Sequence, residues 1–218
     1  MSKLYEVVQR PEQASQRQGH VLYTPAKPVL KFDADLESTV TKMIETMHHE
    51  DGIGIAAPQV DIPLQIFIIE SNMDSARYSL LKKYPQLQPV PQQVFINPRI
   101  VEASKESIAY WHGCLSAKGL DRGRLRSYKS LRYEAQDVKG KKVEGSLDNL
   151  AAIIFQHEFR HLLGGLYVDH AKEFLKLEDM REAVLLGKTD LYTEKNIDEI
   201  PHILSDYQIG AWVGSLAK

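Results

Sequence analysis

The residues with the clearest capacity for chemistry lie within one short apolar segment, positions 150–163. His157 and His161 are four residues apart, so on an α-helix their side chains share one face and can bind one metal ion. Glu158 follows the first histidine and places a carboxylate where it can accept a proton from a metal-activated water. Burying that carboxylate without a partner costs several kcal/mol, and a metal ion is one such partner. The pattern therefore favours a metal site over a charged pair on a solvated helix face.

A catalytic metal ion usually has three protein ligands, and this helix supplies only two. His170 and Glu173 lie downstream, but Gly164-Gly165 breaks the helix before them, and neither has the spacing usual in zinc peptidases. Upstream, Cys114 is the single cysteine of the chain and is followed by Leu115. A lone cysteine is also commonly a small buried apolar residue, so the residue types alone leave the third ligand open.

Residues 52–59, with the sequence Gly-Ile-Gly-Ile-Ala-Ala-Pro-Gln, form another distinctive segment. Two glycines alternate with apolar residues, which lets a second backbone approach closely, as a bound peptide requires. The segment lacks the Lys-Ser/Thr ending of a phosphate loop and the sixth-position glycine of a dinucleotide-binding loop. A structural turn and a peptide-binding cradle both remain consistent with it.

An amphipathic helix precedes this segment. Its apolar residues recur at helical spacing, at Leu36, Val40, Met43, Ile44 and Met47. Asp33 or Asp35 is placed to cap its start, and Gly52 follows its end. His48 and His49 close the helix, where the helix dipole favours a positive charge. A solvated helix end accounts for them better than a metal role, because neighbouring residues cannot face the same point.

The remaining elements are mostly strands. Residues 64–69 and 94–101 have strand composition, residues 131–138 and 142–147 form a predicted hairpin, and residues 150–163 form a predicted buried helix. Residues 71–93 are polar and carry three prolines, so they are predicted to be an insertion or a long surface loop. Strands followed by a buried helix predict an α+β fold, with antiparallel or mixed β-sheets packed around the central metal-binding helix.

Composition and charge exclude several classes of protein. With 218 residues, 43% of them hydrophobic and 26% charged, the chain is predicted to form one globular domain, with or without an appendage. A net charge of -2 argues against a nucleic-acid-binding domain. No apolar window reaches the roughly 18 to 20 residues of a membrane-spanning helix, and residues 1–20 lack the features of a secretory signal. A reducing, cytoplasmic location is therefore expected.

Three motifs in order resemble those of the peptide deformylase family, which have the forms G-x-G-φ-A-A-x-Q, E-G-C-φ-S and Q-H-E-x-D-H, where φ is apolar. The corresponding segments here are Gly52 to Gln59, His112 to Ser116 and Gln156 to His161. The resemblance extends over residues 30–169, nearly two thirds of the chain. Each motif alone is modest, but three in this order are specific.

The resemblance implies that Cys114 joins His157 and His161 as the ligands of one divalent ion. Ferrous iron is the family's usual metal, and Zn²⁺ or Ni²⁺ can also occupy such a site. The implied reaction is hydrolysis of the formyl group from the N-terminal formylmethionine of new polypeptides. Glu158 would then accept and return the proton. The side-chain amide of Gln59 and the backbone N–H of Leu115 would donate hydrogen bonds to the developing oxyanion.

The same resemblance implies how the formylmethionyl peptide would bind. Backbone around Ile53 and Gly54 is expected to pair with it as an added strand. Ile153 and Ile154 precede His157 by four and three residues, so they lie on the same face of the helix. They are candidates for the methionine pocket and equally for core packing.

The chain is divided into a deformylase-like catalytic domain, residues 1–175, with an insertion at about 71–93, and a C-terminal extension, residues 176–218. The extension has five basic and eight acidic residues, so its net charge of -3 suits it poorly to ribosomal RNA. Any contact with the ribosome, which the resemblance suggests, is expected to come from elsewhere in the chain or to be weak. Trp212 and Val213 are expected to dock on the body of the protein, with a surface for a partner as the alternative.

Two residues depart from the family motifs. His112 stands where the second motif has Glu, and Arg160 where the third has Asp. If those acids normally hold a shared cation, Arg126 is the candidate for it, and three basic groups would then repel one another. One hypothesis is an active deformylase with a different charge partner. The alternative is a divergent protein that binds peptide or metal without turnover, or that acts on another amide.

Overall fold

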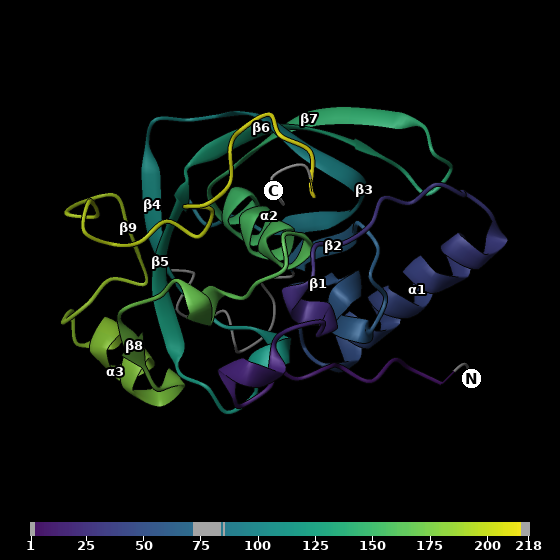
Figure 1. The fold of residues 1–218 in the computed structure, drawn as a ribbon. Coiled ribbons are helices and arrows are strands. Elements are labelled where there is room, and N and C mark those ends of the chain that lie inside the picture. The colour runs from purple at the N-terminus through teal and green to yellow at the C-terminus, as the bar shows by residue number, and fades with distance from the viewer. Residues whose placement is uncertain (1–2, 72–83, 85, 215–218) are drawn as a thin grey trace.

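Two β-sheets and a helix between them form the centre of the computed structural model, which describes residues 3–71, 84 and 86–214 (Figure 1). One sheet has the order β1-β2-β3-β6-β7, with β1 Gly54–Ala56, β2 Ile66–Ser71, β3 Val90–Ala103, β6 Ser130–Gln136 and β7 Lys142–Asp148. The other has the order β8-β5-β4-β9, with β8 Phe174–Leu175, β5 Arg122–Tyr128, β4 Ser107–His112 and β9 Tyr192–Thr193. These strands all pair antiparallel, and the predicted α+β fold is confirmed.

The central helix, α2, spans Asn149–Leu162 and confirms the helix expected over residues 150–163. It is buried on almost every side because it packs against both sheets. The ring of Phe155 lies edge-on to Phe67 of β2 and Phe95 of β3, at centroid distances of 4.9 and 5.0 Å. Gly164, with φ of 82°, then ends the helix in a left-handed conformation that glycine adopts without strain.

Helix α1 covers the outer face of β1 and β2 and spans Ala34–His49. The Asp33 side chain accepts a hydrogen bond from the N–H of Leu36 at 3.1 Å, which identifies Asp33 as the N-cap. Ile66 and Ile68 of β2 belong to the buried cluster under α1, whereas Phe67 and Ile69 belong to the cluster around α2. Both faces of β2 are therefore buried, which explains its unbroken run of apolar residues.

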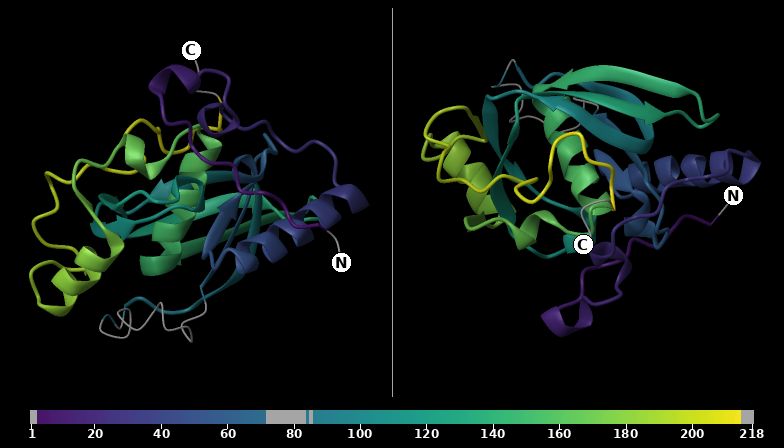
Figure 2. Two further views of the ribbon diagram at one scale, coloured as in Figure 1. Left: turned by 90° about the horizontal axis from the view of Figure 1, so that it is seen from below. Right: turned by 45° about the horizontal axis from the view of Figure 1, so that its top comes forward.

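The remaining regular elements are short. The 3₁₀ turns are η1 Ala14–Gln16, η2 Val21–Tyr23, η3 Ala57–Val60, η6 Leu115–Ala117 and η7 Tyr167–Asp169, and the last helix is α3, Leu177–Leu185. Helices α1 and α3 lie at opposite sides of the molecule in both views of Figure 2. None of the helices in the described part of the chain has the length and apolar character needed to cross a membrane.

Strand β3 starts at Val90, four residues before the start expected from the sequence. The last residues of the predicted insertion, 90–93, therefore belong to the sheet, where Gln93 pairs with Ile69. Residues 72–83 and 85 of that insertion lie outside the described residues. Strands β4 and β5 were also not predicted. Strand β5 alternates arginines with Gly123, Leu125 and a serine and so has little apolar periodicity.

The C-terminal segment after α3 links the two sheets across the end of α2. Its residue Ile203 donates a backbone hydrogen bond to β5 at 3.0 Å, and Gly210 donates one to β3 at 2.9 Å. Figure 1 shows this segment, in yellow, passing over α2. Val213 docks on the body as expected, whereas Trp212 stays half exposed under the guanidinium of Arg99. Several side chains of the segment join the main core, so it packs as part of the same body.

Gln156, just before His157, fixes α2 against the second sheet. Its Nε2 donates to the carbonyl oxygens of Tyr128 and Ala152, and its Oε1 accepts from the N–H of Tyr128, each at 2.9 Å. Because Tyr128 ends β5, this amide sets the position of the helix along the sheet.

We expect Gln156→Ala to lower the free energy of unfolding by about 2 kcal/mol, because it leaves two backbone groups of Tyr128 without partners. Urea denaturation followed by circular dichroism measures this change. The exposed Gln208 provides the control, since Gln208→Ala should change stability by less than about 0.5 kcal/mol. Equal stability of the two variants would contradict the role assigned to Gln156.

Candidate metal centre and active site

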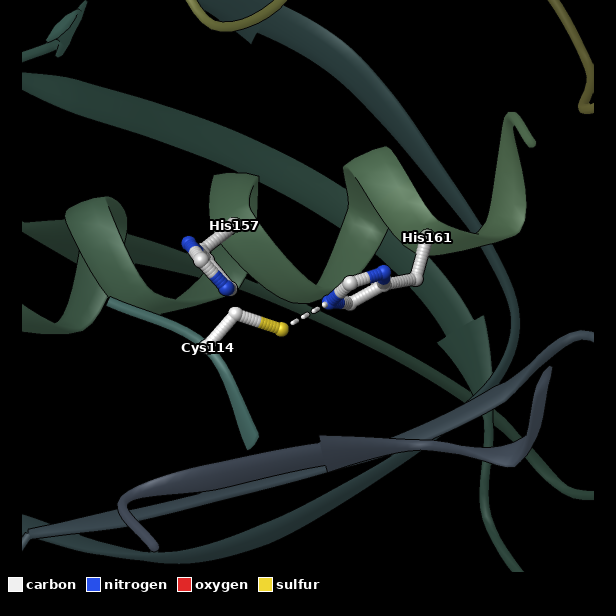
Figure 3. Close-up of side chains that lie close together, drawn as sticks. All are labelled: Cys114, His157 and His161. Atoms are coloured by element: carbon white, nitrogen blue, oxygen red, sulfur yellow. Dashed lines mark hydrogen bonds between the residues drawn. The ribbon is translucent and has the colours of Figure 1, made fainter. Parts of the chain in front are cut away.

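Three candidate metal ligands converge at one point, as Figure 3 shows. Cys114 comes from the loop between β4 and β5, residues 113–121, which we call the cysteine loop, and His157 and His161 come from α2. One ligand atom from each lies within 4.8 Å of the others, and the sulfur is 3.3 Å from Nε2 of His161. Burial lowers the pKa of His157 to about 4 and also lowers that of His161. Both imidazoles are therefore neutral at neutral pH, which is the form that binds a metal. One sulfur and two imidazole nitrogens fit a divalent transition-metal ion.

The cysteine side chain is held by hydrogen bonds that support a negative sulfur. Cys114 caps η6, and its sulfur accepts the backbone N–H of Ser116 at 3.4 Å and Nε2 of Gln59 at 3.3 Å. Burial raises the pKa of the Cys114 thiol, and the charge of Glu158 raises it further. A cation between Cys114 and the two histidines offsets both effects, because a metal-bound thiol is deprotonated.

Glu158 is buried beside this cluster, and burial raises the pKa of its carboxyl group. Within the described residues, its Oε2 is buried without a hydrogen-bond partner. The carboxylate lies against Gly54 of β1 so closely that a Cβ there would be 2.4 Å from Oε1. Glycine at position 54 thus makes room for the carboxylate, and the unpartnered oxygen fits a site completed by a metal ion, water or substrate.

Gln59 lies between the glycine-rich segment and the cysteine loop. Its Oε1 accepts the N–H of Ala56 at 2.8 Å, and its Nε2 lies 3.3 Å from both the Cys114 sulfur and Oγ of Ser116. The structure therefore brings Gln59 to the predicted site, with its amide donor already shared between two acceptors. Leu115 is the first residue of η6, so its N–H has no partner within that turn.

An N-terminal strap, residues 8–10, joins these two loops and was not identified from the sequence. Val8 N–H donates to the carbonyl of Gln59 at 2.8 Å, and Arg10 N–H donates to that of Ser116 at 2.9 Å. Between them, Gln9 donates to the Leu115 carbonyl at 3.0 Å and accepts the N–H of Lys118 at 3.1 Å. The strap thus fixes both ends of the turn that follows Cys114.

A pocket of about 610 Å³ opens beside the cluster. Its lining includes all the residues predicted to bind peptide: Ile53, Gly54, Ile153 and Ile154. Ile153 and Ile154 also belong to the main buried cluster, so they pack in the core and face the pocket.

Arg122 is the cation beside the cysteine loop, in place of the Arg126 suggested by the sequence. It lies over Gly113 so closely that a Cβ there would be 1.5 Å from the guanidinium. Burial is the main cause that lowers the pKa of His157, and the charge of Arg122 lowers it further. Arg126 instead lies beside His202. Burial is the main cause that lowers the pKa of His202, and the charge of Arg126 lowers it further. Since Arg122 and Arg126 lie on the same face of β5, only the pairing of the strand decides which one reaches the loop.

His112 contacts the metal-ligand set directly. Its Nδ1 lies 3.1 Å from Nδ1 of His157, and the two rings are nearly parallel, at 8°. Burial lowers the pKa of His112, as do the nearby His157 and Arg122. A neutral His112 can therefore share a hydrogen bond with His157, and the expected repulsion among His112, Arg126 and Arg160 does not arise.

Arg160 finds its charge partner in the C-terminal segment. Its buried guanidinium pairs with Asp206, whose side chain is 56% exposed. Although partial burial raises the pKa of Asp206, the charge and hydrogen bond of Arg160 bring it below its usual value. Gly165 leaves room for the guanidinium, because a Cβ there would be 2.9 Å from its Nε.

The other candidate ligands lie in separate contacts. His170 is 3.4 Å from Oγ of Ser205, and Glu173 pairs with Arg124 at 3.3 Å. At the end of α1, half-exposed His48 pairs with Glu70 at 2.7 Å. These contacts are consistent with structural roles for all three.

A helix that presents two histidines and a carboxylate to a cysteine loop, within an α+β fold, defines a metal-dependent hydrolase. The family model described as "Polypeptide deformylase" matches residues 5–176. The chain therefore belongs to the polypeptide deformylase family.

Individual relatives agree with this assignment. Peptide deformylase 2 of Pseudomonas syringae pv. tomato is 37% identical over 153 residues, which are 70% of this chain and 81% of that protein. Peptide deformylase of Thermotoga petrophila is 40% identical over 170 residues, 75% of this chain and 93% of that protein. The Met-Ala-Ser-bound crystal structure of class I type b peptide deformylase from Acinetobacter baumannii matches with a TM-score of 0.67 and 31% identity, over 78% of this chain and 99% of that one.

We expect His112→Ala to weaken the affinity for a divalent ion by about tenfold or more, because His157 loses the partner of its Nδ1. Competition with a chelating indicator, using Zn²⁺, measures this affinity. His170→Ala is the matched control, since His170 lies outside the ligand cluster. Unchanged affinity and occupancy in His112→Ala would show that the contact does not support the metal site.

We expect Asp206→Ala to lower the free energy of unfolding by about 1–2 kcal/mol. The buried charge of Arg160 then lacks its partner, while the exposure of Asp206 reduces the loss. The double variant Arg160→Leu/Asp206→Ala removes both charges and should be more stable than Asp206→Ala alone. Thermal and urea unfolding of the set measures this coupling, and simple additivity of the single changes would argue against the pair.

Proposed function

We propose that this chain is an active deformylase that hydrolyses the formyl group from N-terminal formylmethionine of newly made polypeptides. One observation carries the proposal: the ligand atoms of Cys114, His157 and His161 lie within 4.8 Å of one another, beside a buried Glu158 with an unpartnered oxygen. A protein that only bound peptide would need no such set of reacting groups.

Cys114, His157 and His161 would hold the ion. When bound, the ion supplies a Lewis acid that lowers the pKa of a water molecule. Glu158 would take a proton from the water whose oxygen adds to the formyl carbon, and would return it to the amine nitrogen as the C–N bond breaks and formate leaves. Its carboxylate lines the same pocket as Cys114 and His157.

Gln59 and the N–H of Leu115 would stabilise the negative charge that develops on the formyl oxygen. In the structure, the Gln59 amide is shared between the sulfur of Cys114 and Oγ of Ser116. Donation to substrate then requires the amide to turn from one of these acceptors. Removing such a donor typically lowers kcat by about 10²- to 10³-fold.

The substrate peptide would extend the first sheet. Strand β1 is the terminal strand of that sheet, and Ile53 and Gly54 line the pocket. A peptide paired along this edge gains backbone hydrogen bonds irrespective of its sequence, which suits an enzyme that acts on many new chains. The apolar Ile153 and Ile154 then accommodate its methionine.

The proposal takes Fe²⁺ as the ion, with Zn²⁺ or Ni²⁺ as replacements, because a thiolate and two imidazoles suit all three. It places the enzyme in the cytoplasm, where a thiolate ligand stays reduced. Contact with the ribosome would be weak, since the net charge is -2.

Formate release from formyl-Met-Ala-Ser by anaerobically purified protein tests the proposal, with metal analysis of every sample. We expect Glu158→Ala to lower kcat by about 10²-fold or more while the metal stays bound, because the proton acceptor is lost. Glu173→Ala, which removes a carboxylate paired with Arg124, is the matched control.

A fully metallated wild type that releases no formate would overturn the proposal. His112 and Arg160 would then mark a protein that binds metal or peptide without turnover. Activity that survives Glu158→Ala would instead remove Glu158 from the proton-transfer role.

A further inference from the structure

The pocket beside the metal-ligand residues extends to a part of the chain that lies beyond the family match. Its lining includes Leu177, Met180 and Arg181 of α3, and Leu191 of the loop that follows. The family model ends at residue 176, so all four lie outside it. From the sequence, these residues were predicted to belong to the C-terminal extension, residues 176–218, without a role at the site.

The segment that carries these residues is fixed at both ends to the sheet that leads into the cysteine loop. Before α3, β8 pairs with β5 where β5 leaves the loop, and after α3, β9 pairs with β4 shortly before β4 enters it. Trp111 of β4 donates its indole N–H to the carbonyl of Asp190 at 3.2 Å. The N–H of Leu191 donates to the hydroxyl of Tyr84 at 3.1 Å. Helix α3 and Leu191 therefore form a fixed wall.

The chemistry of this wall matches an apolar side chain. Met180 and Leu191 are each only 5% exposed, and they line the same pocket as Ile153 and Ile154 of α2. An apolar pocket discriminates between substrates by length and shape, and each missing or extra methylene changes specificity by about tenfold or more. An unbranched side chain of the length of methionine is suited to such a space.

We propose that Met180 and Leu191 form the far wall of the pocket for the first side chain of the substrate and set the length that it accepts. This inference rests on the proposed deformylase function. It makes α3 part of the substrate site, although α3 lies outside the segment that defines the family.

The test compares Met180→Ala, Leu191→Ala and Val184→Ala in the full chain with its metal. Val184 is the matched control, because it lies on the same helix and is 6% exposed but does not line the pocket. The first readout is kcat/KM for formyl-Met-Ala-Ser and formyl-Phe-Ala-Ser. The second is the dissociation constant of the product peptides Met-Ala-Ser and Phe-Ala-Ser, which does not require turnover.

A shortened wall should admit the larger side chain. We expect the Phe-to-Met ratio of kcat/KM to rise about tenfold in Met180→Ala and Leu191→Ala, and to stay within about twofold of wild type in Val184→Ala. The binding ratio should change in the same direction. If Met180→Ala does not fold, as judged by its melting temperature, Leu191→Ala tests the same wall from outside the helix.

Two results would overturn the inference while the deformylase function stands. One is an unchanged ratio in both pocket variants, and the other is an equal rise in Val184→Ala, which would point to general loosening of α3. If the wild type releases no formate, the proposed function fails, and the ratio of the dissociation constants of Phe-Ala-Ser and Met-Ala-Ser alone tests the wall. A rise in the two pocket variants only would then still support the wall, and no rise would reject it.

Discussion

Three buried ionisable side chains and one partly buried cysteine lie at one point, and this cluster constrains the rest of the structure. Burial favours the neutral form of each, because it raises the pKa of Cys114 and Glu158 and lowers that of His157 and His161. Such a cluster is costly unless a cation lies among its members. The scaffold must therefore hold it rigidly: Gln156 fixes the helix, and aromatic rings pack around it.

Rigidity on the other side of the site comes from contacts between distant parts of the chain. The loops that carry Gln59 and Cys114 are more than fifty residues apart, and they meet through one amide that touches both the sulfur and Ser116. Gln9 then fixes the turn after Cys114 from the far N-terminus. Under the proposed function, these contacts would hold the two loops that carry the oxyanion donors, Gln59 and Leu115, in place before the substrate arrives.

Local patterns account for what the sequence could predict. Helical spacing placed His157 and His161 on one face of α2 and predicted α1 with a cap at Asp33 or Asp35, because both signals lie within a few turns of one helix. Cys114 was assigned as a candidate ligand only through the resemblance to the family motifs. Its contact with His161 joins residues 47 positions apart, and no periodicity in one sequence encodes such a distance.

The residues that the sequence did not predict also depend on contacts between distant parts of the chain. Arg122 and Arg126 alternate on one face of β5, and strand pairing alone decides which one lies over the cysteine loop. Asp206 is an ordinary surface acid in the sequence, and its role follows from the path of the C-terminal segment over α2. The start of β3 at Val90 likewise depends on pairing with β2, which overrides the prolines on either side.

The two departures from the family motifs place basic residues at acidic positions, yet neither leaves an unpaired charge. Arg160 reverses the sign expected on α2, and Asp206 restores balance from a segment beyond the family match. Helix α2 thereby depends on the C-terminal segment after α3, which also contributes Leu191 to the lining of the pocket. Neutral His112 stands where the second motif has glutamate, and its contact with His157 holds the ring of that residue in one orientation, so both departures are accommodated by contacts that the family motifs do not encode.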